Sequence, residues 1–282
     1  MKFDVEELTM KLKVLVDNNT FIDEYYKGEP AWSVYIECDG KNILFDTGYS
    51  DMFIKNADMM EINLCNLDYI VFSHGHPDHT WGLKYLIDLY KTGEYKRPTL
   101  IANESVFDNK FDDNKNSIGC DITREEINQY MDINTTNCSF NITKSLIYLG
   151  YINRLSDFEN KNPIGKTVVN NKLIEDYVLD DTALAYKAND GIVIITGCSH
   201  SGITNIVEAA KEITGNKNVI DIIGGFHLFK ENITEVAKTA EYFKYEKVKM
   251  LHPCHCTDLK SKIEIAKTNP VEEVGVGLEL NY

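Results

Sequence analysis

The sequence predicts an α/β protein in which two sheets pack together and helices cover their outer sides. Residues 1–103 alternate short apolar runs with amphipathic segments, and the same rhythm resumes at residue 181. Between these halves, residues 104–180 are rich in Asn and Asp and contain few long apolar runs. Sheets and helices each have an apolar side to bury, and two βα-rich halves bury both by packing sheet against sheet.

The first half begins with three predicted strands. Apolar residues alternate along 12–16 and predict one strand, while residues 32–37 and 42–45 predict a pair of strands around an Asp-Gly turn. Ser50 or Asp51 is then expected to cap a short helix.

A buried strand at residues 69–72 leads directly into the densest polar motif of the chain. That motif reads Ser73-His74-Gly75-His76-Pro77-Asp78-His79. A helix is expected after it, with one apolar face formed by Leu83, Leu86, Ile87 and Tyr90. The spacing of three and four residues is the signal for a helix.

The middle stretch, 104–180, is expected to be an insertion that caps a site within one domain spanning residues 1–282. Thr123 can cap a helix and Glu126 can close a capping box there. A loosely structured surface loop is the alternative, but structureless loops of this length are uncommon in compact domains.

The third stretch is expected to supply the second set of strands and helices. Strands are predicted at 182–187, 191–196, 219–223 and 247–251, helices at 204–213 and 233–243, and a closing strand at 274–278. The chain shows no short internal repeat, although its two halves share this βα rhythm.

The net charge of −15 comes from 44 acidic against 29 basic side chains. Such a surface repels phosphate backbones and anionic lipid headgroups, which argues against a nucleic-acid or membrane partner. A small anionic substrate is still compatible, because a metal ion and a few local cations can dominate the field of a site. A small molecule is therefore the expected partner, and a homo-oligomer is left open.

The N-terminal residues 1–16 are acidic where a signal peptide needs a basic patch and then an apolar run, so a cytoplasmic location is expected. The seven cysteines are an odd number and are scattered along a large chain. Free thiols or metal ligation fit this pattern better than a disulfide framework.

The seven histidines all fall directly after predicted strands. They are His74, His76 and His79 in HGHPDH, His200 in GCSH, His227 in GGFH, and His252 and His255 in HPCHC. Residues at strand ends can converge in space although they are far apart in the sequence, which is how sites of α/β proteins are usually assembled.

Neutral imidazole and carboxylate groups bind zinc, iron or manganese near neutral pH. His74 and His76 can grip one ion, while Asp78 and His79 can face a second ion nearby. Two such ions would hold a water or hydroxide between them, lower its pKa and polarise a carbonyl or phosphoryl oxygen. The alternative is a turn whose histidines merely cap the next helix.

The HGHPDH motif, preceded by Ile43-Leu44-Phe45-Asp46-Thr47-Gly48, resembles the signature of the metallo-β-lactamase superfamily. More narrowly, the chain resembles a branch of metal-dependent hydrolases that includes the archaeal dihydropterin–aminobenzene ribosyl-phosphate synthases. Further matching pieces are Val16 to Asn19, Asp180 to Leu184, Thr196 to His200, Gly224 to Leu228 and Cys254 to Thr257. The resemblance covers nearly the whole chain.

This resemblance implies a four-layer αββα sandwich with the metals at one edge between the sheets. It implies that His74 and His76, with a third histidine, hold the first ion. The second ion would be held by Asp78, His79 and His255, and Asp46 would fix the geometry of the ligand loop from behind.

One departure concerns Cys198, which stands where many superfamily members have a bridging Asp. His200, two residues later, is then the choice for the third histidine of the first ion. Cys198 is either a soft ligand that favours zinc or a small buried thiol. Without a bridging carboxylate the second metal could be weak or absent.

Two further residues are candidates for contact with a substrate. His227 would face the site as a substrate contact or proton donor, and its alternative is a packed strand-end histidine. Arg154, one of three arginines in the chain, could anchor a phosphate or carboxylate, and its alternative is an ordinary salt bridge.

The resulting hypothesis is an enzyme, a metal-dependent hydrolase that uses a metal-bound hydroxide on a small anionic ester, phosphodiester or lactone. Asp78 or His227 would move the proton. One or two divalent ions are expected, with zinc as the first choice and manganese or iron as alternatives. A dihydropterin synthase-like transferase and a non-catalytic, metal-containing ligand sensor are the competing hypotheses.

Overall fold

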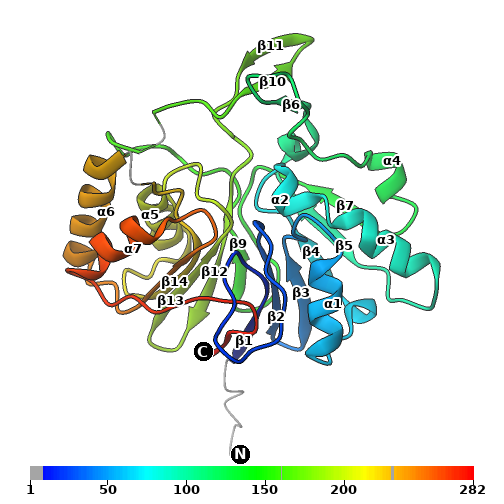
Figure 1. Cartoon of the computed structure of the whole chain (residues 1–282), viewed down its shortest axis with the longest axis horizontal. Helices are drawn as coiled ribbons and strands as arrows, with labels where there is room; N and C mark the ends of the chain where they lie inside the picture. Colours follow the sequence, from blue (N-terminus) through cyan, green and yellow to red (C-terminus); the bar gives the residue numbers. More distant parts are fainter. Residues whose placement is uncertain (1–8, 160, 230–231) are drawn as a thin grey trace, which may run out of the picture.

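Figure 1 shows the computed structural model of the chain, which describes residues 9–159, 161–229 and 232–282. Two large sheets face each other, and helices lie outside both. Helices α1 (Met52–Met59) and α3 (Leu83–Lys91) cover one sheet, while α5 (Ile203–Thr214), α6 (Ile233–Glu246) and α7 (Leu259–Ala266) cover the other. This arrangement confirms the predicted four-layer αββα sandwich.

Both sheets mix parallel and antiparallel neighbours. The first contains, in spatial order, β16 (Glu279–Asn281), β1 (Met10–Val16), β2 (Ser33–Cys38), β3 (Lys41–Phe45), β4 (Tyr69–Val71), β5 (Thr99–Ala102) and β7 (Asp132–Thr135). The second contains β15 (Leu251–Cys254), β14 (Val219–Gly225), β13 (Gly191–Thr196), β12 (Ala183–Ala188), β9 (Leu146–Tyr148) and β8 (Phe140–Asn141).

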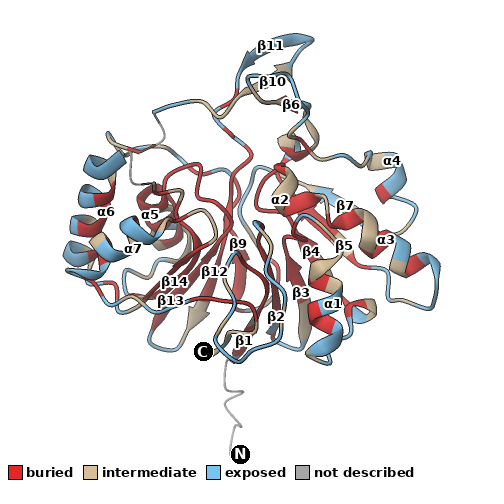
Figure 2. Ribbon diagram, viewed as in Figure 1, coloured by how far each residue is buried: buried red, intermediate tan, exposed pale blue. Residues whose placement is uncertain are grey.

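Alternation along the strands explains how three layers of core form. Inward residues of both sheets, such as Val14, Phe45 and Ile195, form the central core between the sheets. Outward residues pack instead against the helices, as Leu44 does beside α1 and α3. Figure 2 shows this buried material concentrated in the sheets and in the inner faces of the helices. Each fully buried aliphatic or aromatic side chain contributes roughly 1.5–3 kcal/mol.

The parallel strands decide where a site can form. Strand β3 pairs in parallel with β4, and β13, β14 and β15 are parallel to one another. The carboxyl ends of parallel strands meet at one edge of a sheet, so the segments that follow them lie together. The histidine motifs HGHPDH, GCSH and GGFH follow β4, β13 and β14, and the Cys-His-Cys segment follows β15.

The middle stretch, 104–180, contributes to three sheets. Strand β7 extends the first large sheet, and β8 and β9 extend the second. Strands β6 (Lys110–Phe111), β10 (Lys166–Val169) and β11 (Lys172–Glu175) form a separate small sheet at the top of Figure 1. The predicted capping box is confirmed at α4 (Arg124–Ile127).

Two predicted strands are wrong near the C-terminus. The strand expected at 247–251 begins only at Leu251, because Lys247 adopts a left-handed conformation with φ 55° and ends α6. The closing strand expected at 274–278 is β16 instead. Gly277 has φ 96°, which breaks an extended run, and pairing with β1 starts at Glu279.

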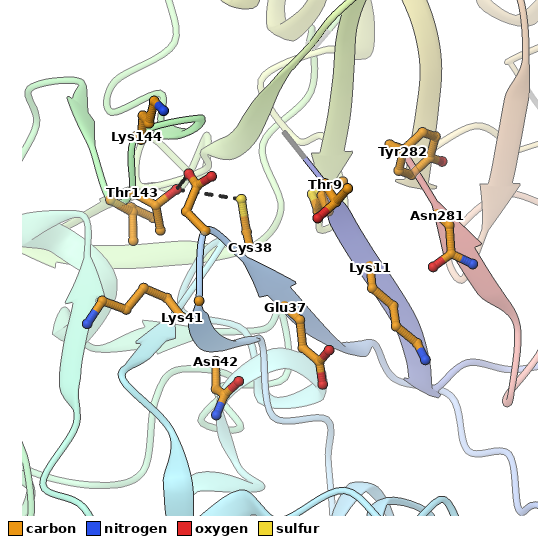
Figure 3. Close-up of a pocket in the computed structure, with 14 residues that line it drawn as sticks. Thr9, Lys11, Glu37, Cys38, Lys41, Asn42, Thr143, Lys144, Asn281 and Tyr282 are labelled. Carbon is orange, nitrogen blue, oxygen red and sulfur yellow. Dashed lines mark hydrogen bonds between the residues drawn. The ribbon is translucent and has the colours of Figure 1, made fainter. Parts of the chain in front are cut away.

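A cleft of about 970 Å³ opens at the other end of the strands, around the turn between β2 and β3 (Figure 3). Its lysines Lys11 and Lys41 pair with Glu279 and Asp68. None of the predicted site residues lines it.

All seven cysteines are free, as expected. No helix in the described part of the chain combines the length and apolar character needed to cross a bilayer.

Candidate metal centre

The HGHPDH segment leaves β4 and turns at once into the short helix α2 (Pro77–Thr80). Pro77 occupies the first helical turn, where its fixed φ suits a helix start, and His76 precedes it in an extended conformation. Gly75 is tightly enclosed, because a Cβ there would lie 2.3 Å from the Val106 carbonyl oxygen. The backbone at Gly75 therefore packs directly against the Val106 carbonyl, which restricts the directions of the neighbouring side chains.

Three histidines from two segments converge into one donor group. His74, His76 and His200 each offer a ring nitrogen, and these three atoms lie within 4.8 Å of one another. His74 Nε2 is 3.0 Å from His76 Nδ1. The Nε2 atoms of His76 and His200 are buried and have no hydrogen-bond partner among the described residues. We call this set the three-histidine group.

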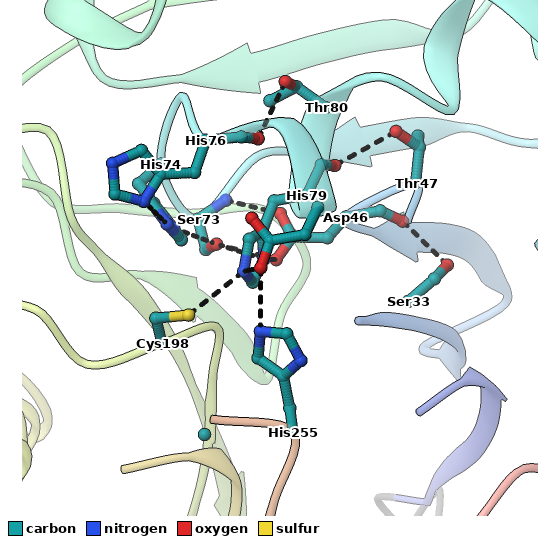
Figure 4. A network of polar contacts seen from close by, with 12 residues as sticks. Ser33, Asp46, Thr47, Ser73, His74, His76, His79, Thr80, Cys198 and His255 are labelled. Atoms are coloured by element: carbon teal, nitrogen blue, oxygen red, sulfur yellow. Dashed lines mark hydrogen bonds and ion pairs between the residues drawn. The ribbon is translucent and has the colours of Figure 1, made fainter. Parts of the chain in front are cut away.

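A second donor group lies directly beside the first (Figure 4). It contains Asp78, His79, Cys198 and His255, whose donor atoms also lie within 4.8 Å of one another. His79 Nε2 is 3.2 Å from Cys198 Sγ, and His255 Nε2 is 3.2 Å from Asp78 Oδ2. The His74 and His79 rings have centroids 4.2 Å apart, so the two groups are neighbours. We call this second set the mixed group.

Asp46 contacts His79 of the mixed group at the ring nitrogen that does not face Cys198. Its Oδ2 lies 2.7 Å from His79 Nδ1, and its two oxygens also accept hydrogen bonds from the Ser73 amide and hydroxyl. A carboxylate on one imidazole nitrogen leaves the other nitrogen, here His79 Nε2, free to face the site. This is the arrangement by which proteins orient histidines that bind metals.

His255 is oriented by the segment that follows β1, a function the sequence did not reveal. Asp17 Oδ1 accepts a hydrogen bond from the His255 amide at 2.9 Å, and Asn18 Oδ1 lies 3.2 Å from His255 Nδ1. Val16 to Asn19 was one of the segments that resemble the family, so the sequence marked it. Its contact with His255, more than 230 positions away, could not be read from the sequence.

Burial sets the protonation of these groups. Desolvation, followed by the neighbouring histidines, holds the pKa values of His74 and His200 well below the ordinary value, and burial lowers the pKa of His76 to about 4. Burial raises the pKa of the Cys198 thiol well above its usual range. Burial also raises the pKa of Asp78, but His79 and His255 outweigh it and lower the pKa overall.

The residues present therefore fit divalent metal ions. Neutral imidazole and ionised carboxylate are the metal-binding forms of these side chains. Buried ring nitrogens without a partner cost free energy, which a metal ion at the same place would offset. The nitrogen, oxygen and sulfur donors are those that zinc accepts, and manganese and iron share the nitrogen and oxygen donors.

His227 lies beside the three-histidine group but belongs to neither donor group. Its ring centroid is 4.4 Å from that of His200, and burial lowers its pKa to about 4. Both histidines line a pocket of about 170 Å³. The same pocket is lined by Glu159, Lys161, Asn162 and Ile164 from the middle stretch.

The two remaining histidine and arginine candidates belong to neither donor group. Arg154 donates to the carbonyl oxygens of Tyr177 and Val178 at 2.6 and 2.7 Å, so two of its nitrogens bind backbone. Its role as a substrate anchor stays a prediction. His252 is buried, and its Nδ1 lies 2.8 Å from Asp221 Oδ1.

Glu159 in this pocket gives the first testable prediction. Burial raises its pKa to about 7, above the value of 4.5 expected in an unfolded chain. Between these values the folded chain binds more protons, so the free energy of unfolding falls as pH rises. Glu159→Gln is expected to remove this term, which is on the order of 2 kcal/mol between pH 5 and pH 8.

Urea unfolding of the metal-free protein at both pH values measures this difference. Glu212→Gln, an exposed glutamate of α5, is the matched control and should unfold with the wild-type pH dependence. Equal pH dependence in Glu159→Gln and the wild type would contradict the raised pKa.

Comparisons with known proteins identify the family to which the chain belongs. A family model described as the metallo-beta-lactamase superfamily matches residues 26–129, which include the HGHPDH segment. The chain is 32% identical over 262 residues to MJ0448, an uncharacterized protein of Methanocaldococcus jannaschii, covering 92% of this chain and 94% of that protein.

Two further relatives have described activities. One is the 7,8-dihydropterin-6-methyl-4-(beta-D-ribofuranosyl)-aminobenzene-5'-phosphate synthase of M. jannaschii, 28% identical over 261 residues, covering 85% of this chain and 87% of that protein. The other is the solved structure of Tm1679, a metal-dependent hydrolase of the beta-lactamase superfamily. It is 29% identical, with a TM-score of 0.82, covering 96% of this chain and 98% of that one. The chain therefore belongs to the metallo-beta-lactamase superfamily.

Proposed function

We propose that this chain is a metal-dependent hydrolase of small anionic esters, phosphodiesters or lactones, with a binuclear, zinc-containing centre. One observation carries the proposal, namely that two donor groups lie side by side at the strand ends. The three-histidine group would hold one ion. Asp78, His79 and His255 would hold the other, and Cys198 would either complete this second set or pack beside it.

Divalent ions in these positions would lower the pKa of a bound water and polarise the oxygen of a substrate. Asp78 is ionised because its pKa is low, so its Oδ2, which faces His255, can accept a hydrogen bond from the attacking water. The same low pKa opposes complete transfer of the proton to this carboxylate. His227 is neutral near pH 7, so its ring N–H can donate a hydrogen bond to the oxygen on which charge develops.

The pocket beside His200 and His227 is the proposed place for the substrate. Four residues of the middle stretch, Glu159, Lys161, Asn162 and Ile164, line it, which supports the proposal that part of 104–180 acts as a cap within a single domain. Its volume of about 170 Å³ is small, so a compact reacting group would fill it and exclude water.

Turnover by the metal-loaded protein tests the proposal. Bis(4-nitrophenyl) phosphate, 4-nitrophenyl acetate and a γ-lactone represent the three substrate classes, with the chelator-treated protein as the blank. Turnover that requires metal with any one of them supports a hydrolase. Tight binding of a ligand without turnover would favour the sensor hypothesis instead.

His227→Gln gives a sharper test of the roles assigned above. The variant keeps both donor groups, so metal content should stay at the wild-type level while kcat falls about 100-fold, because one hydrogen bond to the developing charge is lost. His252→Gln, which alters a histidine bound to Asp221, serves as the control. A wild-type kcat in His227→Gln would remove this residue from the mechanism.

A dihydropterin synthase-like transferase is the second candidate, favoured by the 28% identity to the M. jannaschii synthase. A transferase would show product only when two substrates are present together. Pterin fluorescence that co-purifies with the chain would also support it. Turnover of a single ester with water as the only co-reactant would favour the hydrolase.

A further inference from the structure

Two consecutive carboxylates, Asp180 and Asp181, lie just before β12 and belong to neither donor group. Both are 1% exposed. A buried carboxylate is retained only where hydrogen bonds or cations compensate its desolvation. Each of them accepts a hydrogen bond from one of the two segments that carry the three-histidine group, and Asp180 also pairs with Lys110.

Asp180 binds the loop between His74 and His76. Its Oδ2 accepts a hydrogen bond from the Gly75 amide at 2.7 Å, and its Oδ1 lies 2.8 Å from Lys110 Nζ. The Gly75 amide belongs to the peptide that joins the two ligand-bearing positions. Asp180 therefore holds the backbone between the two positions from which these imidazoles extend.

Lys110 supplies the charge that allows Asp180 to be buried. The lysine side chain is 2% exposed and also contacts Asp176 at 3.0 Å. Lys110 is in β6 and Asp176 directly follows β11, so this ion cluster ties the small sheet to the ligand loop. Removing one partner of a buried ion pair leaves an uncompensated buried charge, so this contact is costly to break.

Asp181 binds the other ligand segment. Its Oδ2 accepts hydrogen bonds from the amide and the hydroxyl of Ser201, the residue after His200. The next residue, Thr182, donates its amide to the Ser73 carbonyl at 2.9 Å. Residues 180–182 therefore bind both segments of the three-histidine group at once.

We propose that Asp180 and Asp181 are positioning residues that hold His74, His76 and His200 in register for a metal ion. This inference rests on the proposed function, because it requires the three-histidine group to be a metal site. The two carboxylates bind two loops that lie more than a hundred residues apart in the sequence and contact each other at the site. Loss of either carboxylate would leave the three histidines present but would change the directions of their ring nitrogens.

Titration of the metal-free full chain with Co²⁺ tests the proposal, because the visible bands of bound Co²⁺ report coordination geometry as well as affinity. Asp180→Ala and Asp181→Ala are each expected to weaken binding at the three-histidine group about 10–100-fold and to alter its bands. Asp181→Asn keeps an acceptor for Ser201 and should restore affinity to within about threefold.

The matched control is Asp221→Asn. Asp221 is also a buried carboxylate with two partners, His252 and Tyr282, but it lies near the start of β14, away from the donor groups. Its variant should lose stability and keep the wild-type Co²⁺ titration. Circular dichroism establishes that each variant is folded, and Ser201→Ala, which removes one donor to Asp181, replaces Asp181→Ala if that variant unfolds.

The outcomes separate the two hypotheses. Wild-type affinity and bands in folded Asp180→Ala and Asp181→Ala would overturn the positioning role and leave the metal site intact. Equal losses in Asp181→Asn and Asp181→Ala would overturn it as well, because the charge rather than the hydrogen bonds would then matter. A wild-type chain that binds no Co²⁺ would overturn both the inference and the proposed function.

Discussion

His76→Ala is expected to lose the ion of the three-histidine group. His76 contributes a buried Nε2 without a protein partner, and an alanine leaves only His74 and His200 as donors. Metal content should fall from about two ions per chain to one or fewer, because three donors are the usual protein share of a catalytic zinc site. Turnover should fall by roughly 10³–10⁴, since metal assistance supplies several kcal/mol.

Elemental analysis of protein purified without chelator or added metal measures this loss. His252→Gln is the matched control. His252 is also a buried histidine, but it lies in β15 and its Nδ1 contacts Asp221 Oδ1 instead of a donor group. It should keep the wild-type metal content. An unchanged metal content in His76→Ala would show that the ion is bound elsewhere. A wild-type chain with only one ion would indicate that the mixed group, which contains Cys198, does not bind a second metal.

Asp46→Asn is expected to weaken metal binding about 10–100-fold and to destabilise the metal-free chain by about 3 kcal/mol. Asp46 is fully buried and accepts from both Ser73 groups and His79. An amide cannot accept at every one of these contacts, because one of its two polar atoms is a donor. The His79 ring would then lose the acceptor that directs its Nε2 to the site.

Asparagine is the appropriate replacement because Asp46 has φ 58°, a left-handed conformation that Asn tolerates and most other residues do not. Backbone strain is thereby kept out of the comparison. Urea unfolding and a metal titration should be measured together, with Asp221→Asn as the control. That control should lose stability without losing metal affinity. Asp46→Asn with wild-type affinity would contradict the role assigned to this carboxylate.

Local patterns were sufficient to predict most helices and strands and the positions of the histidines. Apolar alternation identified the strand around 12–16, an apolar run identified the one around 191–196, and the three–four spacing from Leu83 to Tyr90 identified a buried helix face. These features depend on neighbours within a few residues, so a single sequence contains them. The capping box at Thr123 is local for the same reason.

Pairing between distant segments was not readable in this way. The segment 274–278 has strand-like composition, yet only Glu279–Asn281 pairs with β1. Strands β7 and β8 were hidden in the polar middle stretch, because short edge strands need little apolar sequence when a formed sheet provides their partners. Strand β9, which lies between β8 and β12, is an apolar run of only three residues. Register and sheet membership depend on which backbone groups meet in the folded chain.

The sequence by itself determined the superfamily, the αββα class and the set of residues able to bind metal. The resemblance had already assigned His200 to the ion of His74 and His76, and His255 to the ion of Asp78 and His79. Only the tertiary structure decided that Cys198 lies with Asp78, His79 and His255. Only the structure revealed that Asp180 and Asp181 bind the two segments that carry His74, His76 and His200, and that Lys110 pairs with Asp180. Residue types determine which chemistry is available, whereas contacts across more than a hundred residues determine its geometry, and these form only when the two sheets pack.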